Sequence, residues 1–347
     1  MSFLTGEPKN SWQPGMTVDT TTSNYWLNWR VTLCSIWIFA SMVFASILIT
    51  KYEGPRGSRN RSREEEKDSP GLLYEDEVWK PCLKTIHPGW LLGYRVVSFL
   101  ILLIMLILNV AVDGGEIFYY YTQWTFTLIT IYFGLGSVLS MYGCYQYHNK
   151  VGGDGIDNER PDAEYGSQRL SMNVQSSNSS NASKQVGENA EQSSRQIADF
   201  WGYVFQIIFQ MIAGAVTLTD CVFWFILVPF LTIRGYNLNF WIINMHSINV
   251  VFLLGDTALN CLRFPWFRIG YFFLWTAVYV VFQWAVHACI SIWWPYPFLD
   301  LSSSFSPLWY SSVAVMHIPC YGIFVLVMKL KHHLLKKWFP HSYKCAR

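Results

Sequence analysis

The 347-residue chain has few charged residues: Lys, Arg, Asp and Glu make up only 14% of it, whereas 52% is hydrophobic and 18% aromatic. Because a soluble protein carries about a quarter charged residues, this composition excludes a water-soluble globule. The net charge is only +2, and the basic residues lie beside apolar runs instead of forming a patch. We therefore expect no nucleic-acid partner.

The patterns of a metal site or a disulfide framework are also missing. The eight cysteines show no Cys-x-x-Cys spacing, and several lie inside apolar runs. Such cysteines are typical of small core side chains. We expect no zinc site, no disulfide framework and no cofactor.

Long uncharged runs are what the sequence has in abundance. A helix that crosses a bilayer needs about 20 apolar residues, and seven windows qualify: 31–50, 96–112, 117–147, 200–233, 235–255, 269–299 and 301–328. The first window lies too far from Met1, and is too long, for a simple signal peptide. The sequence thus predicts an all-α, polytopic membrane helix bundle of about seven transmembrane helices.

Lys and Arg are unevenly shared between the two sides of such a bundle. The segments on one side (51–90, 146–199, 262–268 and the tail from Lys329) hold 21 of the 25, whereas the other side holds Lys9, Arg30 and Arg234. Because cytoplasmic loops are enriched in Lys and Arg, we predict that the N-terminus lies outside and the C-terminus in the cytosol.

The chain divides accordingly into seven parts. We predict an outer tail over 1–30, a first transmembrane helix over 31–50, a charged cytosolic loop over 51–90, helices two and three within 91–145, a disordered cytosolic loop over 146–199, helices four to seven within 200–330, and a basic cytosolic tail over 331–347. The 146–199 loop has nine Ser, six Asn and two aromatic residues. This is too little apolar surface to offset the entropy of ordering.

Three of the predicted spans carry a polar stripe along one helical face. The stripes include Asp220 in the fourth span; His246, Asn249, Asp256 and Asn260 in and just after the fifth; and Thr276, Gln283 and His287 in the sixth. The seventh has His317 as its single titratable group. Ionisable groups inside a membrane usually face the bundle interior, so we expect Asp220 and Asp256 to point inward. Hydrogen bonding between helices is an alternative role for any of these side chains.

Thr122, His246 and His287 approach the outer boundary of the bundle at similar depth. A hydroxyl and an imidazole are the minimum parts for nucleophilic cleavage of an ester, because a neutral His can accept the proton of a weakly nucleophilic Thr during attack. Chance placement of a Thr near a His is the competing interpretation.

Several short motifs resemble the rolling stone and androgen-induced hydrolase superfamily. They are Tyr-Tyr-Thr-Gln-Trp (120–124), Ile-Tyr-Phe-Gly (131–134), Asn-Met-His-Ser (244–247) followed by Asp256, Val-His (286–287), and Trp-Pro-Tyr-Pro-Phe-Leu-Asp (294–300). The segments 24–30 and 86–92 resemble plant members of the rolling stone branch. The resemblance covers roughly 86–330, and the order and spacing of the motifs carry it.

The resemblance implies a lipid hydrolase. Members of the androgen-induced branch are multi-pass hydrolases of fatty acid esters of hydroxy fatty acids, and their intramembrane Thr and His correspond to Thr122 and His246. We predict that these two residues are catalytic, with His287 in a supporting role, and that the partners are membrane lipids, including a fatty ester substrate. The membrane is the endoplasmic reticulum or another endomembrane, or the plasma membrane. The alternative is a non-catalytic membrane protein for adhesion, fusion or scaffolding, since rolling stone itself is described by a role in myoblast fusion.

Overall fold

The computed structural model describes residues 18–53, 71–153, 196–229 and 240–345, and within these ranges it is helical, with no strand. Six helices are long and apolar enough to cross a membrane: α2 (Trp29–Glu53), α6 (Pro88–Asp113), α7 (Tyr121–Gly153), α9 (Phe200–Val222), α13 (Ile269–Cys289) and α14 (Ser306–Trp338). The shorter ones are α1 (Ser23–Trp26), α5 (Glu75–Trp79), α11 (Phe240–Met245) and α12 (Ile248–Leu259). The chain is therefore an integral, multi-pass membrane protein.

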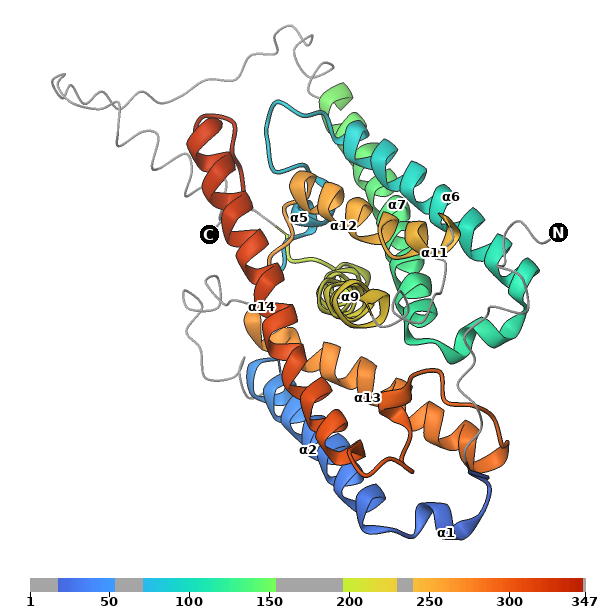
Figure 1. The fold of residues 1–347 in the computed structure, drawn as a ribbon. Coiled ribbons are helices and arrows are strands. Elements are labelled where there is room, and N and C mark those ends of the chain that lie inside the picture. Colours follow the sequence, from blue (N-terminus) through green and yellow to red (C-terminus); the bar gives the residue numbers. More distant parts are fainter. Residues whose placement is uncertain (1–17, 54–70, 154–195, 230–239, 346–347) are drawn as a thin grey trace, which may run out of the picture.

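The helix α9 is the centre of the bundle. Figure 1 shows it nearly end-on, with α6 and α7 on one side and α2, α13 and α14 on the other. Small residues let its neighbours approach closely: a Cβ atom added to Gly214 would lie 2.4 Å from the ring of Phe272 in α13. On the α7 side, the rings of Phe205 and Phe209 stack on Tyr132. The two larger apolar clusters of the described residues thus both pack against α9.

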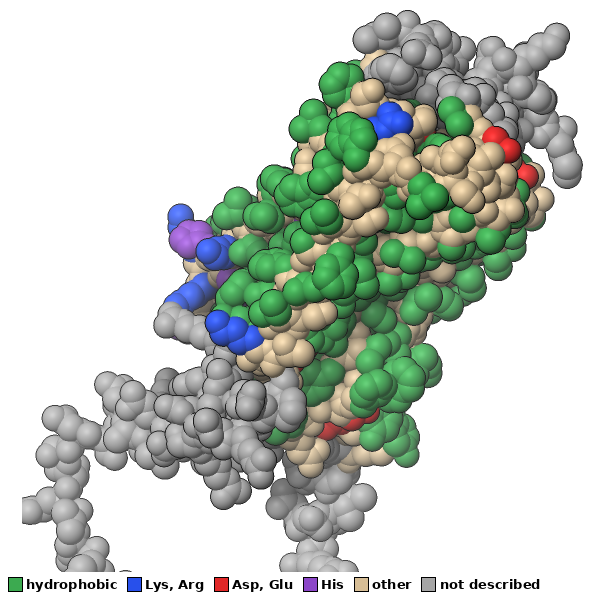
Figure 2. Space-filling view, turned by 90° about the horizontal axis from the view of Figure 1, so that it is seen from below, with side chains coloured by type: hydrophobic (Ala, Val, Ile, Leu, Met, Phe, Trp, Pro, Cys, Tyr) green, Lys and Arg blue, Asp and Glu red, His purple; other side chains and the backbone are tan. Residues whose placement is uncertain are grey.

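The outer surface of the bundle is apolar. Figure 2 shows hydrophobic side chains over most of one face and few charged ones, which gather toward its margins. Large side chains of α2 and α6 are exposed, among them Phe39, Ile104 and Ile107. Such extensive apolar exposure is unfavourable in water and suits contact with lipid.

The predicted fifth span, 235–255, differs from the other six. Residues 230–239 lie outside the described part of the chain, and the helix is broken at His246 and Ser247 into α11 and α12. With 12 residues, α12 is too short to cross a bilayer by itself. The structure describes six membrane-competent helices, and it does not confirm the predicted count of seven.

The chain nonetheless runs back along the bundle between α9 and α13. Arg268, just before α13, donates to Gln206 in the second turn of α9, so the two helices begin at the same end. The far end of α9 carries Asp220, which faces His246. From there α12 leads back to Asn260, whose carbonyl oxygen accepts a hydrogen bond from Lys331 near the end of α14.

The predicted loops at 51–90 and 146–199 are partly helical where they are described. The helix α7 continues to Gly153, and 154–195 lie outside the described residues. In the first loop, α5 places Trp79 against α7, where a Cβ atom on Gly143 would lie 2.1 Å from the indole. Glu77 of α5 is buried and accepts hydrogen bonds from Arg263. This segment is ordered because the apolar Val78 and Trp79 have a helix surface to cover.

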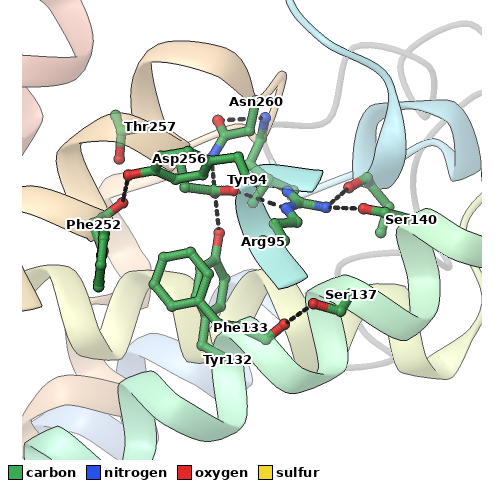
Figure 3. A network of polar contacts seen from close by, with 12 residues as sticks. Tyr94, Arg95, Tyr132, Phe133, Ser137, Ser140, Phe252, Asp256, Thr257 and Asn260 are labelled. Atoms are coloured by element: carbon green, nitrogen blue, oxygen red, sulfur yellow. Dashed lines mark hydrogen bonds and ion pairs between the residues drawn. The ribbon is translucent and has the colours of Figure 1, made fainter. Parts of the chain in front are cut away.

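A buried ion pair joins α6 to α12 (Figure 3). The Nε atom of Arg95 lies 2.7 Å from Oδ1 of Asp256, and both side chains are 0% exposed. The other carboxylate oxygen accepts from the Tyr132 hydroxyl of α7 at 2.5 Å and from the Asn260 amide at 2.8 Å. The expectation that Asp256 points inward to polar groups of neighbouring helices is confirmed.

The guanidinium group of Arg95 extends the network to two further segments. Its Nη1 atom donates to the carbonyl oxygen of Val78 in α5 at 2.9 Å and to the hydroxyl of Ser140 in α7 at 2.7 Å (Figure 3). One charge pair therefore fixes α5, α6, α7 and α12 relative to one another.

We predict that Asp256→Asn is strongly destabilising, by about 3–5 kcal/mol, because it leaves the buried Arg95 cation without its counter-charge. Tyr132→Phe removes one hydrogen bond and should cost about 1–2 kcal/mol. The measurement is reversible unfolding of the purified protein in micelles. The double variant Arg95→Met with Asp256→Leu, which removes both charges, should recover part of the loss. Equal stability of Asp256→Asn and Tyr132→Phe would contradict this account.

Candidate functional site

His246 lies between α11 and α12, beside the end of α9. Its Nδ1 atom is 3.8 Å from Oδ1 of Asp220, and its ring stacks on Phe223 with 3.7 Å between the ring centroids. Phe223 opens a π-helical turn, Phe223–Leu227, that directly follows α9. Short π-helical turns are frequent at functional sites, and Phe223 of this turn contacts the imidazole. A carboxylate partner for His246 was not among the sequence predictions.

Thr122 lies in the first turn of α7, facing the segment that connects α13 to α14. Burial raises the pKa of Tyr296 in that segment to about 12, and hydrogen bonding to Thr122 works against this rise. The neighbouring Gln123 contacts Met245, with 3.7 Å between the amide nitrogen and the sulfur. Thus α7 and α11 adjoin here, yet among the described contacts no hydrogen bond joins Thr122 to His246.

His287 lies elsewhere, in the last turn of α13. Its Nδ1 atom is 2.7 Å from the carbonyl oxygen of Gln283, and its ring stacks on Trp294 with 3.6 Å between centroids. Its own carbonyl oxygen accepts a hydrogen bond from Thr20. Within the described part of the structure, His287 makes no contact with His246. Its described partners hold the end of α13 to neighbouring segments.

A different threonine–histidine pair is in direct contact: Thr276 of α13 and His317 of α14. The Oγ1 atom of Thr276 lies 2.8 Å from Nε2 of His317, and Nδ1 of His317 lies 2.8 Å from the carbonyl oxygen of Val313. A carbonyl oxygen only accepts, so Nδ1 carries the proton, and Nε2 of the neutral imidazole accepts from the threonine. The hydroxyl of Thr276 therefore donates to Nε2 at 2.8 Å, and the carbonyl oxygen of Phe272, at 3.3 Å, is a more distant second acceptor.

A third polar group completes this arrangement. The hydroxyl of Tyr121, at the start of α7, lies 2.8 Å from Oγ1 of Thr276. Because the threonine proton is directed at His317, Tyr121 is the donor in this contact. The imidazole is 2% exposed and stacks on Phe273. Packing and the Val313 carbonyl thus hold the base in one orientation, which is how an activated hydroxyl nucleophile is built.

Thr276 and His317 line an apolar pocket between α2, α13 and α14. It is a half-open groove on the surface of the bundle and not an enclosed cavity, and its empty volume of about 490 Å³ includes the open space at its mouth. The walls are aromatic and aliphatic, and Trp37 and Trp309 at its edge are 41% and 44% exposed on the lipid-facing surface. Two small side chains, Ala277 and Ala314, are among its lining residues. The pocket suits an acyl chain that enters from the bilayer.

The reacting groups lie deep within the bundle. At a rise of about 1.5 Å per residue, Thr276 lies about 20 Å from the C-terminal end of α13, and His317 about 16 Å from the N-terminal end of α14. The sequence contained a signal for both residues, because Thr276 belongs to a polar stripe and His317 is the single titratable group in the last apolar window. The prediction of catalytic residues instead selected Thr122, His246 and His287, which were expected near the outer boundary of the bundle.

The comparisons with known proteins give no information on this site. No protein-family model, curated protein or solved structure matches the chain. The similarity to the rolling stone and androgen-induced hydrolase superfamily therefore stays a prediction. Among the described residues, no group of three or more His, Cys, Asp or Glu side chains is arranged to hold a metal ion.

Proposed function

We propose that this multi-pass membrane protein hydrolyses lipid esters, with Thr276 as nucleophile and His317 as general base. The observation that carries the proposal is the 2.8 Å hydrogen bond from the Thr276 hydroxyl to Nε2 of His317, at the wall of an apolar pocket between α2, α13 and α14. Nucleophile, base and an oriented imidazole are the combination that acyl transfer requires.

The chemistry proceeds in two balanced steps. Oγ1 of Thr276 attacks the ester carbonyl while Nε2 of His317 accepts the hydroxyl proton, and this proton then passes to the departing alcohol. The resulting acyl-threonine is cleaved by water, which gives one proton to His317 and releases the fatty acid as the threonine hydroxyl is restored. Tyr121, 2.8 Å from Oγ1, is placed to donate to the oxygen that gains negative charge.

The depth of the pair bears on the substrate. The hydrocarbon core of a bilayer is about 30 Å thick, so atoms about 16–20 Å from the helix ends lie near its middle, far from the ester groups of phospholipids. A suitable substrate carries its ester partway along a chain. Fatty acid esters of hydroxy fatty acids, the class that the superfamily resemblance implies, have this form.

The predicted pair Thr122 and His246 is a second candidate site for the same activity. The observation in its favour is Asp220, 3.8 Å from His246, because a carboxylate stabilises the imidazolium that forms when a histidine accepts a proton. Its weakness is the lack of a described contact between hydroxyl and imidazole. The two sites share no residue, so substitutions separate them.

We further propose seven crossings, with the N-terminus outside and the C-terminus in the cytosol. The return of the chain between α9 and α13 supports an odd number of passes. If the six long helices were the only crossings, α9 and α13 would be consecutive crossings and would begin at opposite ends of the bundle, whereas they begin at the same end. The excess of Lys and Arg in the segments that follow α2, α7 and α14 supports the orientation.

We predict that Thr276→Ala, His317→Gln and the double variant each lose turnover of a long-chain ester of a hydroxy fatty acid by about 100-fold or more, and to the same extent, because nucleophile and base act as a unit. Thr276→Ser, which keeps the hydroxyl, should retain activity. The assay uses purified protein in lipid nanodiscs, with folding checked by thermal unfolding. Thr122→Ala and His246→Ala are the matched controls and should stay active.

The opposite pattern, activity lost with Thr122 and His246 but kept without Thr276, would assign the chemistry to the second site. Wild-type protein that turns over no long-chain ester would favour the non-catalytic role in adhesion, fusion or scaffolding.

Filling the pocket should separate substrate binding from chemistry. We predict that Ala314→Phe lowers the rate for long-chain esters about tenfold, equivalent to about 1.4 kcal/mol, because the added ring occupies the space of the acyl chain. Hydrolysis of a short, soluble ester should change little, since Thr276 and His317 are untouched. Equal loss for both substrates would show that the pocket does not hold the acyl chain.

Glycosylation in microsomes tests the proposed topology. We predict that an Asn-x-Thr site appended to the N-terminus is glycosylated and that the same site at the C-terminus is not, because only luminal segments meet the transferase. The native sequons at Asn60, Asn178 and Asn181 serve as internal controls and should stay unmodified. A glycan on Asn178 would reverse the orientation.

A further inference from the structure

Three cysteines meet where the C-terminal tail folds back on the bundle. Cys82, before α6, and Cys261, after α12, form a small apolar cluster against which Cys345 of the tail packs. The sulfur atoms of Cys261 and Cys345 lie 2.6 Å apart, although 84 residues separate them in sequence. All three are free thiols. Paired thiols at this distance have no role in the proposed hydrolysis.

The backbone around the cluster is fixed by hydrogen bonds. The amide of Lys344 donates to the carbonyl oxygen of Cys82 at 2.9 Å, and the amide of Lys84 donates to that of Ser342 at 2.7 Å. On the other side, the amide of Cys82 donates to the carbonyl oxygen of Leu259 at 2.8 Å. The three chain segments that carry the thiols are thereby held together in the reduced protein.

We propose that Cys261 and Cys345 form a reversible disulfide that locks the C-terminal tail to the end of α12, with a low-molecular-weight disulfide such as oxidised glutathione as the oxidant. A disulfide bond is about 2.05 Å long, so the two sulfur atoms need to move by only about half an ångström.

The reaction balances as a thiol–disulfide exchange. Cys345, the less buried of the two thiols, attacks one sulfur of oxidised glutathione and releases one glutathione, which leaves a mixed disulfide on the tail. The sulfur of Cys261 then attacks Cys345 and releases the second glutathione. The two cysteines are oxidised, the glutathione disulfide is reduced, and the two thiol protons end on the two released glutathiones.

The surroundings of the pair slow its oxidation. The hydrogen bond with Cys261 is the largest cause that raises the pKa of Cys345, to about 12, and burial acts in the same direction. Because the thiolate is the reactive form, the raised pKa slows the attack of Cys345 on oxidised glutathione. The redox state of the surrounding glutathione pool decides whether the bond forms. On the proposed topology the cluster faces the cytosol, where protein disulfides are transient and regulatory.

The lock would act on the proposed site from a distance. The ring closed by Cys261 and Cys345 contains all of α13 and α14, which carry Thr276 and His317. Lys331 near the end of α14 already donates to the carbonyl oxygen of Asn260, at 2.5 Å. A covalent bond next to this contact would hold the end of α14 against α12 more firmly.

The experiment equilibrates purified, full-length protein in nanodiscs with glutathione buffers of increasing oxidation, traps free thiols by acid and alkylation, and identifies linked peptides by mass spectrometry. We expect a Cys261–Cys345 crosslink in most molecules under oxidising conditions and its loss on reduction. The crosslink should be absent from Cys261→Ser and Cys345→Ser and present in Cys82→Ser and Cys289→Ser, the last an exposed cysteine outside the cluster. Oxidation should also raise the midpoint of thermal unfolding of the wild type, but not of Cys345→Ser.

The wild-type measurement decides the matter even if a variant fails to fold. A Cys82–Cys345 link as the main product, a mixed glutathione disulfide that persists on Cys345, or free thiols throughout the oxidised range would each overturn the proposal.

Discussion

The buried pair of Arg95 and Asp256 is the constraint on which the rest of the bundle depends. Two charges far from water are tolerated when further hydrogen bonds satisfy most of their donors and acceptors. Here the partners come from α5, α7 and the residue after α12, and Nη2 of Arg95 is the one polar side-chain atom of the pair without a described partner. The short α12 has no length of its own to span a bilayer. The carboxylate of Asp256 ties α12 to α6 and α7, and this contact also constrains where the segments after α12 lie.

The consequences reach the candidate site along the chain. After α12, Asn260 meets Lys331 of α14, and Arg268 meets Gln206 of α9 and Glu53 at the end of α2. These polar contacts at one end of the bundle set where α13 begins and how α14 lies beside it. The depth of Thr276 follows from where α13 begins, because a helix is rigid over the two turns between Arg268 and Thr276.

The sequence predicted the helical class and six of the spans, because an apolar run of sufficient length has few other places to be stable. It also predicted that Asp256 faces inward. It did not predict the break at His246, because the mean hydropathy of a window does not register a local turn. It also did not predict that Arg95 is the partner of Asp256. The Thr276–His317 contact was equally hidden, because the register between α13 and α14 is set by the intervening segment, where Tyr25 binds Asp300 and Leu301.

The two histidine sites differ in what each lacks. Among the described residues, His246 has a carboxylate at 3.8 Å but no hydroxyl in hydrogen-bonding contact. His317 has a hydroxyl at 2.8 Å and, on its other ring nitrogen, the Val313 carbonyl as its described partner. A carbonyl fixes the tautomer but stabilises an imidazolium less than a carboxylate does. In the reaction that we propose, proton transfer to His317 is therefore closely matched by loss of the proton to the leaving alcohol, so that no full charge accumulates in the low-dielectric interior. For the proposed activity, such a base is better suited to an ester, whose alcohol leaves readily, than to an amide. This preference comes from the Val313 carbonyl behind the imidazole and not from Thr276 or His317 themselves.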